Sequence, residues 1–474
     1  MSGPLRLIPT EGAHALPSLD GRLLEVCSAA VHPDEVAAVL ESEGLTDEQV
    51  RERYGRRSVF ELAAELYERA PRAYPEPEAA PDPWQTDPWR CVLRGVLFAL
   101  PGLGYVLGAR LLPAGAPDIL GLPAGGAVLA VSVLFGWAWN QALAHRAYLL
   151  LAIGDGGRAA AARCMLVGAP LGTLAVAVPA VVVPDTAAAG VFAAGQSCYL
   201  GAATVLLVMG GEKLLLAALA PTVLGAGVLT VADVSDGLLT ALLGGTVALA
   251  VLAAAGVVTR ALVEDWAARP GRLTALERAV QEQLTPPPPA VRSIPYGLFG
   301  LAAGLLTLTT AVGGILRYGA GAPLAGPATL ALTLSMGGAE WLLYRIRSRT
   351  LAVLRHGHTL AVFRAGVAAV LLSTLAGYLG LLTLLALLLR QPADLALLSL
   401  AALGAVLWLA LLLQALGTAW PPALVCGAAA IVQLALLGSQ SASPAGAQLT
   451  VALCATAVLL VLALTVLARA TSHR

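Results

Sequence analysis

Long apolar runs separated by short polar segments make up most of the chain after about residue 90. Each run is about 18 to 25 residues long, which is enough for a helix to cross a hydrocarbon core of about 30 Å. The runs are continuously apolar and do not alternate, so we expect helices and not a barrel. The pattern predicts twelve membrane-spanning helices, near residues 91–112, 120–142, 164–184, 187–209, 213–232, 237–259, 296–316, 323–345, 364–388, 394–414, 416–437 and 447–468.

The first 90 residues have a different pattern, with short amphipathic segments that carry helix-start signals. These signals are Asp34, Thr46 with Gln49, and Ser58 with Glu61, and the last two pairs each fit a capping box. Between residues 71 and 90 the composition turns to Pro, Glu, Asp and Ala, which is typical of a stiff linker. We therefore expect a small soluble helical domain over residues 1–70, joined to the membrane part by a Pro-rich linker over 71–90.

The longest polar segment inside the membrane part divides the predicted spans into six and six. It contains a charged helical stretch at 275–284 and then four prolines from Pro286 to Pro289, and a proline run commonly marks a boundary. The expected organisation is an all-α polytopic membrane protein, with a first six-helix half over residues 91–260, a cytoplasmic linker over 261–294 and a second half over 295–474.

The two halves also share a short pattern. The second span of each half holds a tryptophan, Trp139 or Trp341, and a basic stretch follows it. Six residue pairs then fall in register: Ala160/Ala361, Arg163/Arg364, Leu171/Leu372, Thr173/Thr374, Leu174/Leu375 and Ala175/Ala376. This favours a parallel repeat about an axis normal to the membrane, although chance produces such matches readily in a sequence rich in Ala and Leu.

Arginine sets the expected orientation. The loops on one side of the predicted spans hold most of the basic residues, whereas the other side has only Arg110, Arg317 and Arg390 beside several aspartates. Loops rich in arginine stay in the cytoplasm. Residues 1–20 lack the pattern of a cleavable signal peptide. We expect a multi-pass protein of a bacterial cytoplasmic membrane with both termini in the cytoplasm, the bacterial source being favoured by the Ala-, Leu- and Arg-rich composition.

Composition and motifs exclude several kinds of function. The formal net charge is zero, so no overall basic field indicates a nucleic-acid partner. The six cysteines stand far apart without a CxxC pair, and neither a metal site nor a cofactor is expected. The sequence contains no motif of a P-loop, a zincin or a serine hydrolase. The chain is therefore predicted not to be an enzyme.

Ionisable residues inside a bilayer are costly, so each one is a candidate for function. Glu340 lies late in the eighth predicted span, close to Tyr344 and Arg345, and it either faces a cytoplasm-open cavity or anchors one of those neighbours at the membrane boundary. Asn140 and Gln141 occupy the matching place in the first half. Gln196 belongs to a polar patch in the fourth span, which either binds a substrate or forms hydrogen bonds between helices.

The layout resembles the multidrug/oligosaccharidyl-lipid/polysaccharide (MOP) exporter superfamily, within it the polysaccharide-flippase and Pel-type exopolysaccharide export branches. The features that carry this resemblance are the six-plus-six spans, both termini inside, and the tryptophan and basic stretch after the second helix of each half. The resemblance implies a flippase-like exporter of a cell-envelope polysaccharide, lipid or amphiphile, which works by alternating access of two six-helix bundles. The alternative is a membrane scaffold that does not transport and recruits a cytoplasmic partner through residues 1–70. Membrane lipids are expected partners in either case.

Overall fold

The computed structural model describes residues 21–71, 87–112, 118, 121–122, 124–154, 156–182, 187–268, 288–319, 321–322, 325–356 and 359–469. The chain divides into two compact units, Met1–Asp82 and Pro83–Arg474. In the described residues the regular elements are all helices. The charged stretch expected at 275–284 lies outside the described residues.

The first unit contains four short helices around its own apolar core. They are α1 (Gly21–Ala29), α2 (Pro33–Ser42), α3 (Asp47–Tyr54) and α4 (Val59–Arg69). Leu40, Leu62 and Leu66 are completely buried in this core, because α2 and α4 pack against each other along their apolar faces. The unit therefore has a hydrophobic core that is separate from the cores of the membrane part.

The three predicted helix starts in this unit have different outcomes. The capping box of Thr46 and Gln49 is present in both directions. The side chain of Ser58 accepts from the backbone of Glu61, but the Glu61 carboxylate accepts from the amide of Arg57 instead of Ser58. The start expected at Asp34 is wrong by two residues, because α2 is capped by His32. Pro33 explains this shift, since proline fits the first turn of a helix and needs no hydrogen bond there.

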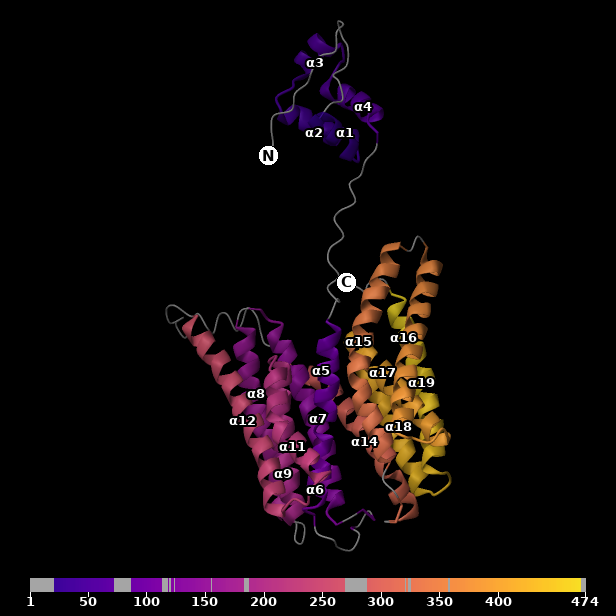
Figure 1. Cartoon of the computed structure of the whole chain (residues 1–474). Helices are drawn as coiled ribbons and strands as arrows, with labels where there is room; N and C mark the ends of the chain where they lie inside the picture. The colour runs from indigo at the N-terminus through magenta and orange to yellow at the C-terminus, as the bar shows by residue number, and fades with distance from the viewer. Residues whose placement is uncertain are drawn as a thin grey trace. The chain divides into compact units, whose positions relative to one another are not determined.

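The second unit contains the long apolar helices (Figure 1). In chain order these are α5 (Pro88–Ala99), α6 (Gly102–Ala109), α7 (Gly126–Leu151), α8 (Gly157–Val182), α9 (Ala187–Val208), α10 (Glu212–Ala218), α11 (Ala220–Leu229), α12 (Asp236–Ala267), the 3-10 turn η1 (Ala290–Ser293), α14 (Ile294–Tyr318), α15 (Gly326–His356), α16 (Leu360–Leu388), α17 (Leu395–Ala415), α18 (Trp420–Gly438) and α19 (Pro444–Leu467).

Eleven helical segments of the described residues are long and apolar enough to cross a membrane. The chain is thus an all-α polytopic membrane protein. The element α15 lies where the eighth span was expected, but it is not one of the eleven, and it carries Glu340 and several arginines. Two spans are broken near a proline: α5 and α6 meet at Pro101, and α11 starts with Ala220 and Pro221 directly after α10. Proline interrupts the helical hydrogen bonds at such places.

The helices of the second unit form two groups that contact each other through four helices. Within the first group α9 packs on α12 and α7 on α8, and within the second group α17 packs on α19 and α15 on α16. Between the groups, α5 packs on α15 and α14 packs on α7. In each of these two contacts a helix at the start of one group, α5 or α14, packs on the long helix that follows the start of the other group, α15 or α7.

Glycine allows both of these contacts between the groups to be close. A Cβ atom on Gly337 of α15 would lie 2.5 Å from the carbonyl oxygen of Cys91 and 3.0 Å from the Cα of Gly95 on α5. A Cβ on Gly300 of α14 would lie 2.7 Å from the carbonyl oxygen of Trp137 on α7. Small residues at such crossings permit direct backbone packing in membranes. We call these two contacts the α5–α15 seam and the α7–α14 seam.

Candidate functional site at the α5–α15 seam

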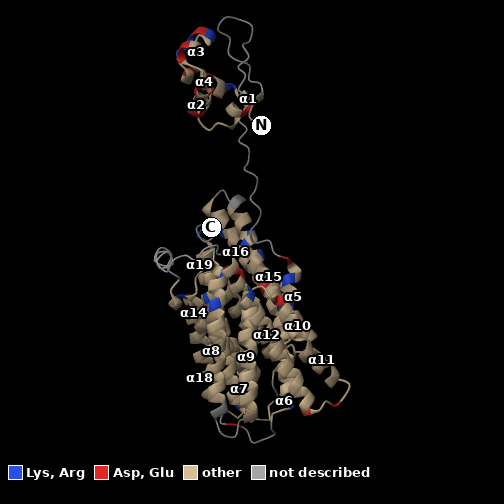
Figure 2. Cartoon of the chain, turned by 90° about the vertical axis from the view of Figure 1, so that its left-hand side faces the viewer, with Lys and Arg blue, Asp and Glu red and all other residues tan. Residues whose placement is uncertain are grey.

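Four charged side chains meet at one end of the α5–α15 seam. The Nη1 group of Arg94 on α5 donates a hydrogen bond to the carboxylate of Glu340 on α15. The Nη2 group of Arg94 lies 3.0 Å from Oε1 of Glu212 on α10. Arg90, one turn before Arg94, also reaches Oε1 of Glu212, at 3.1 Å. The cluster therefore joins two helices of the first group to one helix of the second (Figure 2).

Local sequence explains why these side chains converge. Asp87 caps α5 and Pro88 follows in its first turn, so Arg90 and Arg94 lie four residues apart on one helix face. Glu212 is the first residue of α10, where a carboxylate is favoured by the helix dipole. Glu340 lies three residues after Gly337, whose lack of a side chain lets α15 approach α5.

Burial differs strongly across the cluster. The side chain of Glu212 is 9% exposed, that of Arg94 is 19% exposed and that of Glu340 is 22% exposed, whereas Arg90 is 58% exposed. The Nε atom of Arg94 has no hydrogen-bond partner. Two positive and two negative groups balance, so no net charge is removed from water. A buried pair of this kind contributes little net stability but is costly to break on one side only.

This arrangement can hold the two groups of helices together or release them. Arg94 has a partner in its own group, Glu212, as well as a partner in the opposite group, Glu340. If α15 moves away from α5, Arg94 therefore keeps one carboxylate and is not left as an isolated charge in the membrane. Movement at this seam consequently costs less than it would if Glu340 were its single partner.

The pairing corrects two interpretations of the sequence. Glu340 does not pair with Arg345, whose guanidinium lies 5.1 Å from the centre of the Trp341 ring. Tyr344 is half-buried on the same helix, one turn beyond Glu340. The local sequence would also allow Glu212 to pair with its neighbour Lys213, but its partners are the two arginines of α5.

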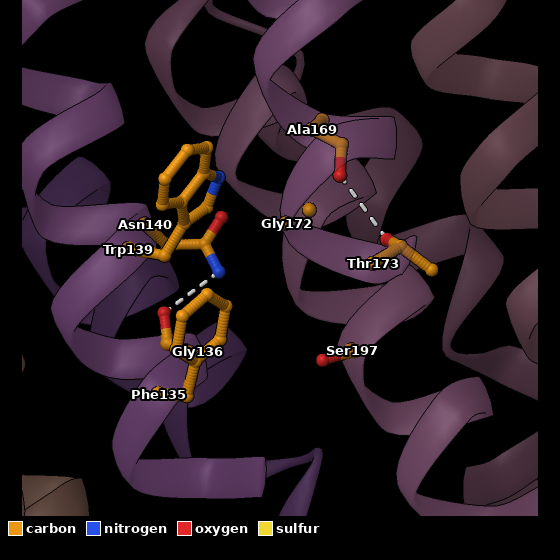
Figure 3. Close-up of a pocket in the computed structure, with 9 residues that line it drawn as sticks. Phe135, Gly136, Trp139, Asn140, Ala169, Gly172, Thr173 and Ser197 are labelled. Carbon is orange, nitrogen blue, oxygen red and sulfur yellow. Dashed lines mark hydrogen bonds between the residues drawn. The ribbon is translucent and has the colours of Figure 1, made fainter. Parts of the chain in front are cut away.

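The other predicted residues lie away from this cluster. Asn140 donates its amide to the carbonyl of Gly136 in its own helix, and its Oδ1 has no partner. It lines a small pocket between α7, α8 and α9, together with Trp139, Gly172 and Thr173 (Figure 3). The empty space there is about 180 Å³, part of it open to the outside, and it is nowhere wide enough for a water molecule. Gln141 packs against Gly300 at the α7–α14 seam.

Gln196 forms hydrogen bonds between three helices of the first group. Its Oε1 accepts from the hydroxyl of Tyr105 on α6, and its Nε2 lies 3.2 Å from the hydroxyl of Ser132 on α7. In the second group the buried Gln433 donates to Thr309 at 2.7 Å in the same manner. Such bonds fix helices against one another inside a bilayer. The structure thus brings Glu340, Tyr344 and Arg345 onto one helix but leaves Asn140, Gln141 and Gln196 apart from them.

The α7–α14 seam has a polar contact of its own. His145 of α7 stacks on Tyr296 of α14 with ring centres 3.6 Å apart, and its Nδ1 lies 3.0 Å from the hydroxyl of Ser293. Arg146, the next residue, donates to the carbonyl of Pro288. The chain segment that enters α14 is therefore attached to the end of α7, so both seams carry polar contacts between the groups.

Sequence reasoning missed Arg94 and underestimated Glu212 as parts of the site. A signal was available for Arg94, because it lies four residues into the first predicted span and four residues after Arg90. Local sequence does not show its partner, because Glu340 lies 246 positions away in the sequence.

The described residues contain no group of three His, Cys, Asp or Glu side chains that could hold a metal ion. A comparison of the sequence with protein-family models and with curated proteins finds no match. The fold and the apolar helices define the chain as a multi-pass integral membrane protein.

Proposed function

We propose that the chain is a flippase-like exporter of the MOP type, in which two six-helix halves rock about the α5–α15 and α7–α14 seams. In this proposal α15 also spans the membrane, as the eighth helix in chain order, which raises the count from eleven to twelve. The halves correspond to residues 91–260 and 295–474. The single observation that carries the proposal is the exchange of contacts between the halves, in which the first span packs on the eighth and the seventh on the second.

Two further observations support movement at these seams. At Gly95, Gly337 and Gly300 the helices approach backbone to backbone, so these three residues have no side chain that must disengage when the helices separate. The bond from Arg94 to Glu340 can open while Arg94 stays paired with Glu212. We interpret the Arg94–Glu340 pair as a gate contact, and the described arrangement as the state in which this gate is closed.

The proposal includes an orientation. Arg94 and Glu212 lie near the starts of α5 and α10, at the end of the second unit from which α15 and α16 project (Figure 1), and that end holds the larger share of the arginines. We infer that it faces the cytoplasm. Labelling of single cysteines placed at residues 236 and 280 tests this, since 280 is expected inside and 236 outside. Labelling of residue 280 from the outside would contradict the proposed topology.

A native cysteine provides the test of rocking. Cys91 is buried in the α5–α15 seam, one turn before Arg94, whereas Cys426 is buried in the core of the second half. In reconstituted full-length protein, the variant Arg94→Gln/Glu340→Gln should react faster at Cys91 with a polar maleimide, while Cys426 stays unreactive. Peptide mapping by mass spectrometry distinguishes the two sites. An unchanged rate at Cys91 would remove the gate from the proposal.

Transport itself needs a separate assay. Liposomes that contain the protein and a fluorescent NBD-labelled phospholipid should lose more than half of their fluorescence to external dithionite if lipid crosses the bilayer, and the double variant should change the rate. Loss of only the outer-leaflet half would exclude lipid flipping and leave an amphiphile or glycan as the substrate.

The close packing at the seams also favours a second candidate, a scaffold that does not transport. In that case the first unit, whose helices span residues 21–69, would recruit a protein partner to the membrane. The labelling experiment separates the two functions: a scaffold would keep Cys91 protected in every variant that still folds, whereas an exporter would not.

A further inference from the structure

The joined ends of α15 and α16 form a hairpin that is too long to remain within a bilayer. The helices have 31 and 29 residues, which corresponds to about 46 and 43 Å at 1.5 Å per residue, against a hydrocarbon core of about 30 Å. Figure 1 shows their joined ends projecting past the neighbouring helices of the same half. We call residues 342–356 and 359–368 the basic hairpin.

The basic hairpin has positive charges without acidic neighbours in sequence. No Asp or Glu occurs between Glu340 and Asp394, whereas the hairpin holds five arginines: Arg345, Arg347, Arg349, Arg355 and Arg364. Arg345, Arg349 and Arg364 are exposed, and the first two lie one helical turn apart. Arg347 is occupied, because it donates to the carbonyl of Ala415. Three exposed guanidinium groups are thus presented to the surroundings.

The hairpin is a packed structure and not a loose loop. Ile346 and Thr350 of α15 and Phe363 and Val367 of α16 are buried between the helices. A Cβ on Gly366 would lie 2.7 Å from Cγ1 of Val353, so the two helices approach closely where the hairpin emerges. This packing turns the three arginines outward and fixes their spacing.

Exposed apolar side chains accompany the arginines. Leu360 and Val362, at the start of α16, are 57% and 61% exposed. The guanidinium of Arg345 lies over the ring of Trp341. Apolar and aromatic side chains next to arginine are typical of the zone where acyl chains meet headgroups. An acidic protein partner would match the charge of the arginines, but it would not explain why apolar side chains are exposed next to them.

We propose that the basic hairpin binds the phosphates of anionic phospholipids in the leaflet from which it emerges. Guanidinium groups bind phosphate oxygens in a bidentate manner, and the exposed apolar residues contact the adjoining acyl chains. This inference requires only that the chain is an integral membrane protein, and it does not depend on the proposed transport.

The expected effect is large enough to measure. Each arginine near an anionic surface contributes a factor of about five to the affinity, so removal of three should weaken binding by about 100-fold. The interaction should also weaken as the salt concentration rises, because the groups are exposed.

The experiment uses the full chain purified in a neutral detergent. Thermal unfolding is followed while phosphatidylglycerol or phosphatidylcholine is added. We expect phosphatidylglycerol to raise the unfolding temperature of the wild type, and phosphatidylcholine to leave it unchanged. The variant Arg345→Gln/Arg349→Gln/Arg364→Gln should require about 100-fold more phosphatidylglycerol for the same shift, and the corresponding triple lysine variant should keep most of the effect.

A matched control removes three arginines that have acidic partners in the structure: Arg110 beside Asp233, Arg163 beside Asp265 and Arg260 beside Glu264. The triple glutamine variant of these residues should respond to phosphatidylglycerol like the wild type. An unaltered response of the hairpin variant would overturn the proposal. An equal response to inorganic phosphate would also overturn it, because it would indicate a general anion surface. So would stabilisation of the wild type by added polyglutamate and not by phosphatidylglycerol, which would indicate an acidic protein partner.

Discussion

Removal of Arg94 should cost much more than removal of any other member of its cluster. Arg94→Gln leaves Glu340 without a cation, while Glu212 keeps Arg90. Removing one partner of a buried pair costs about 3–5 kcal/mol. Because Arg94 and Glu340 are each about one fifth exposed, we expect about 2–3 kcal/mol of lost unfolding free energy.

The other variants follow from the same geometry. Glu340→Gln leaves Arg94 paired with Glu212, so its cost should be about 1 kcal/mol. Arg90→Gln removes an exposed partner and should change the free energy of unfolding by less than about 0.5 kcal/mol. The double variant Arg94→Gln/Glu340→Gln should be no less stable than Arg94→Gln alone, because it removes the carboxylate that the single variant leaves unpaired.

Equilibrium unfolding in mixed detergent micelles, followed by circular dichroism, measures these four variants against the wild type. The double-mutant cycle gives the coupling between Arg94 and Glu340, which we expect to be about 1–2 kcal/mol. Equal costs for Arg94→Gln and Arg90→Gln, or strict additivity in the cycle, would refute the reasoning, since both results require that Arg94 and Glu340 do not interact.

Three further predictions concern other parts of the chain. Gly337→Leu should prevent normal assembly of α15 on α5, because the new side chain would meet the carbonyl oxygen of Cys91, and reduced recovery of folded protein from membranes checks this. The first unit should lose stability in acid, because the hydrogen bond from Arg56 lowers the pKa of Glu65. The Arg56–Glu65 pair therefore stabilises the folded unit above the ordinary pKa of 4.5, and this stabilisation is lost as the pH falls through the lower pKa of the folded state. Thermal unfolding of residues 1–82 between pH 7 and pH 3 tests this. Thr46→Ala should destabilise the same unit by about 1 kcal/mol in denaturant titrations, since it removes the capping box.

The positions of the long helices follow from the sequence because the bilayer imposes a length and a composition on each of them. The predicted second span ended at residue 142, yet α7 continues to Leu151, and α15 continues past 345 to His356. The basic stretches after these spans are therefore extensions of the same helices. Hydropathy ends a span where charges begin, whereas a helix ends where its backbone hydrogen bonds end.

Contacts between helices that lie far apart in the chain could not be predicted from the sequence. Glu340 was identified as a charged residue within a span, but its partner was not, because the depth of Arg94 in its span does not indicate which carboxylate it contacts. The seams depend on Gly95, Gly337 and Gly300, and in a chain with 50 glycines the pattern does not show which ones allow two helices to touch. The role of Glu340 as a gate stays a prediction.

The charge balance at Arg94 bears on how the protein is made. The first half leaves the ribosome before the second, and by then it already contains Arg90, Arg94 and Glu212, two cations and one anion. The missing negative charge arrives with Glu340, more than a hundred residues later. During synthesis the Arg90–Arg94–Glu212 group therefore carries an excess positive charge until α15 is made. Its neutralisation by Glu340 favours α15 over the other late helices as the partner of α5. We therefore expect the ion cluster to favour the contact of α15 with α5 when the later helices enter the membrane.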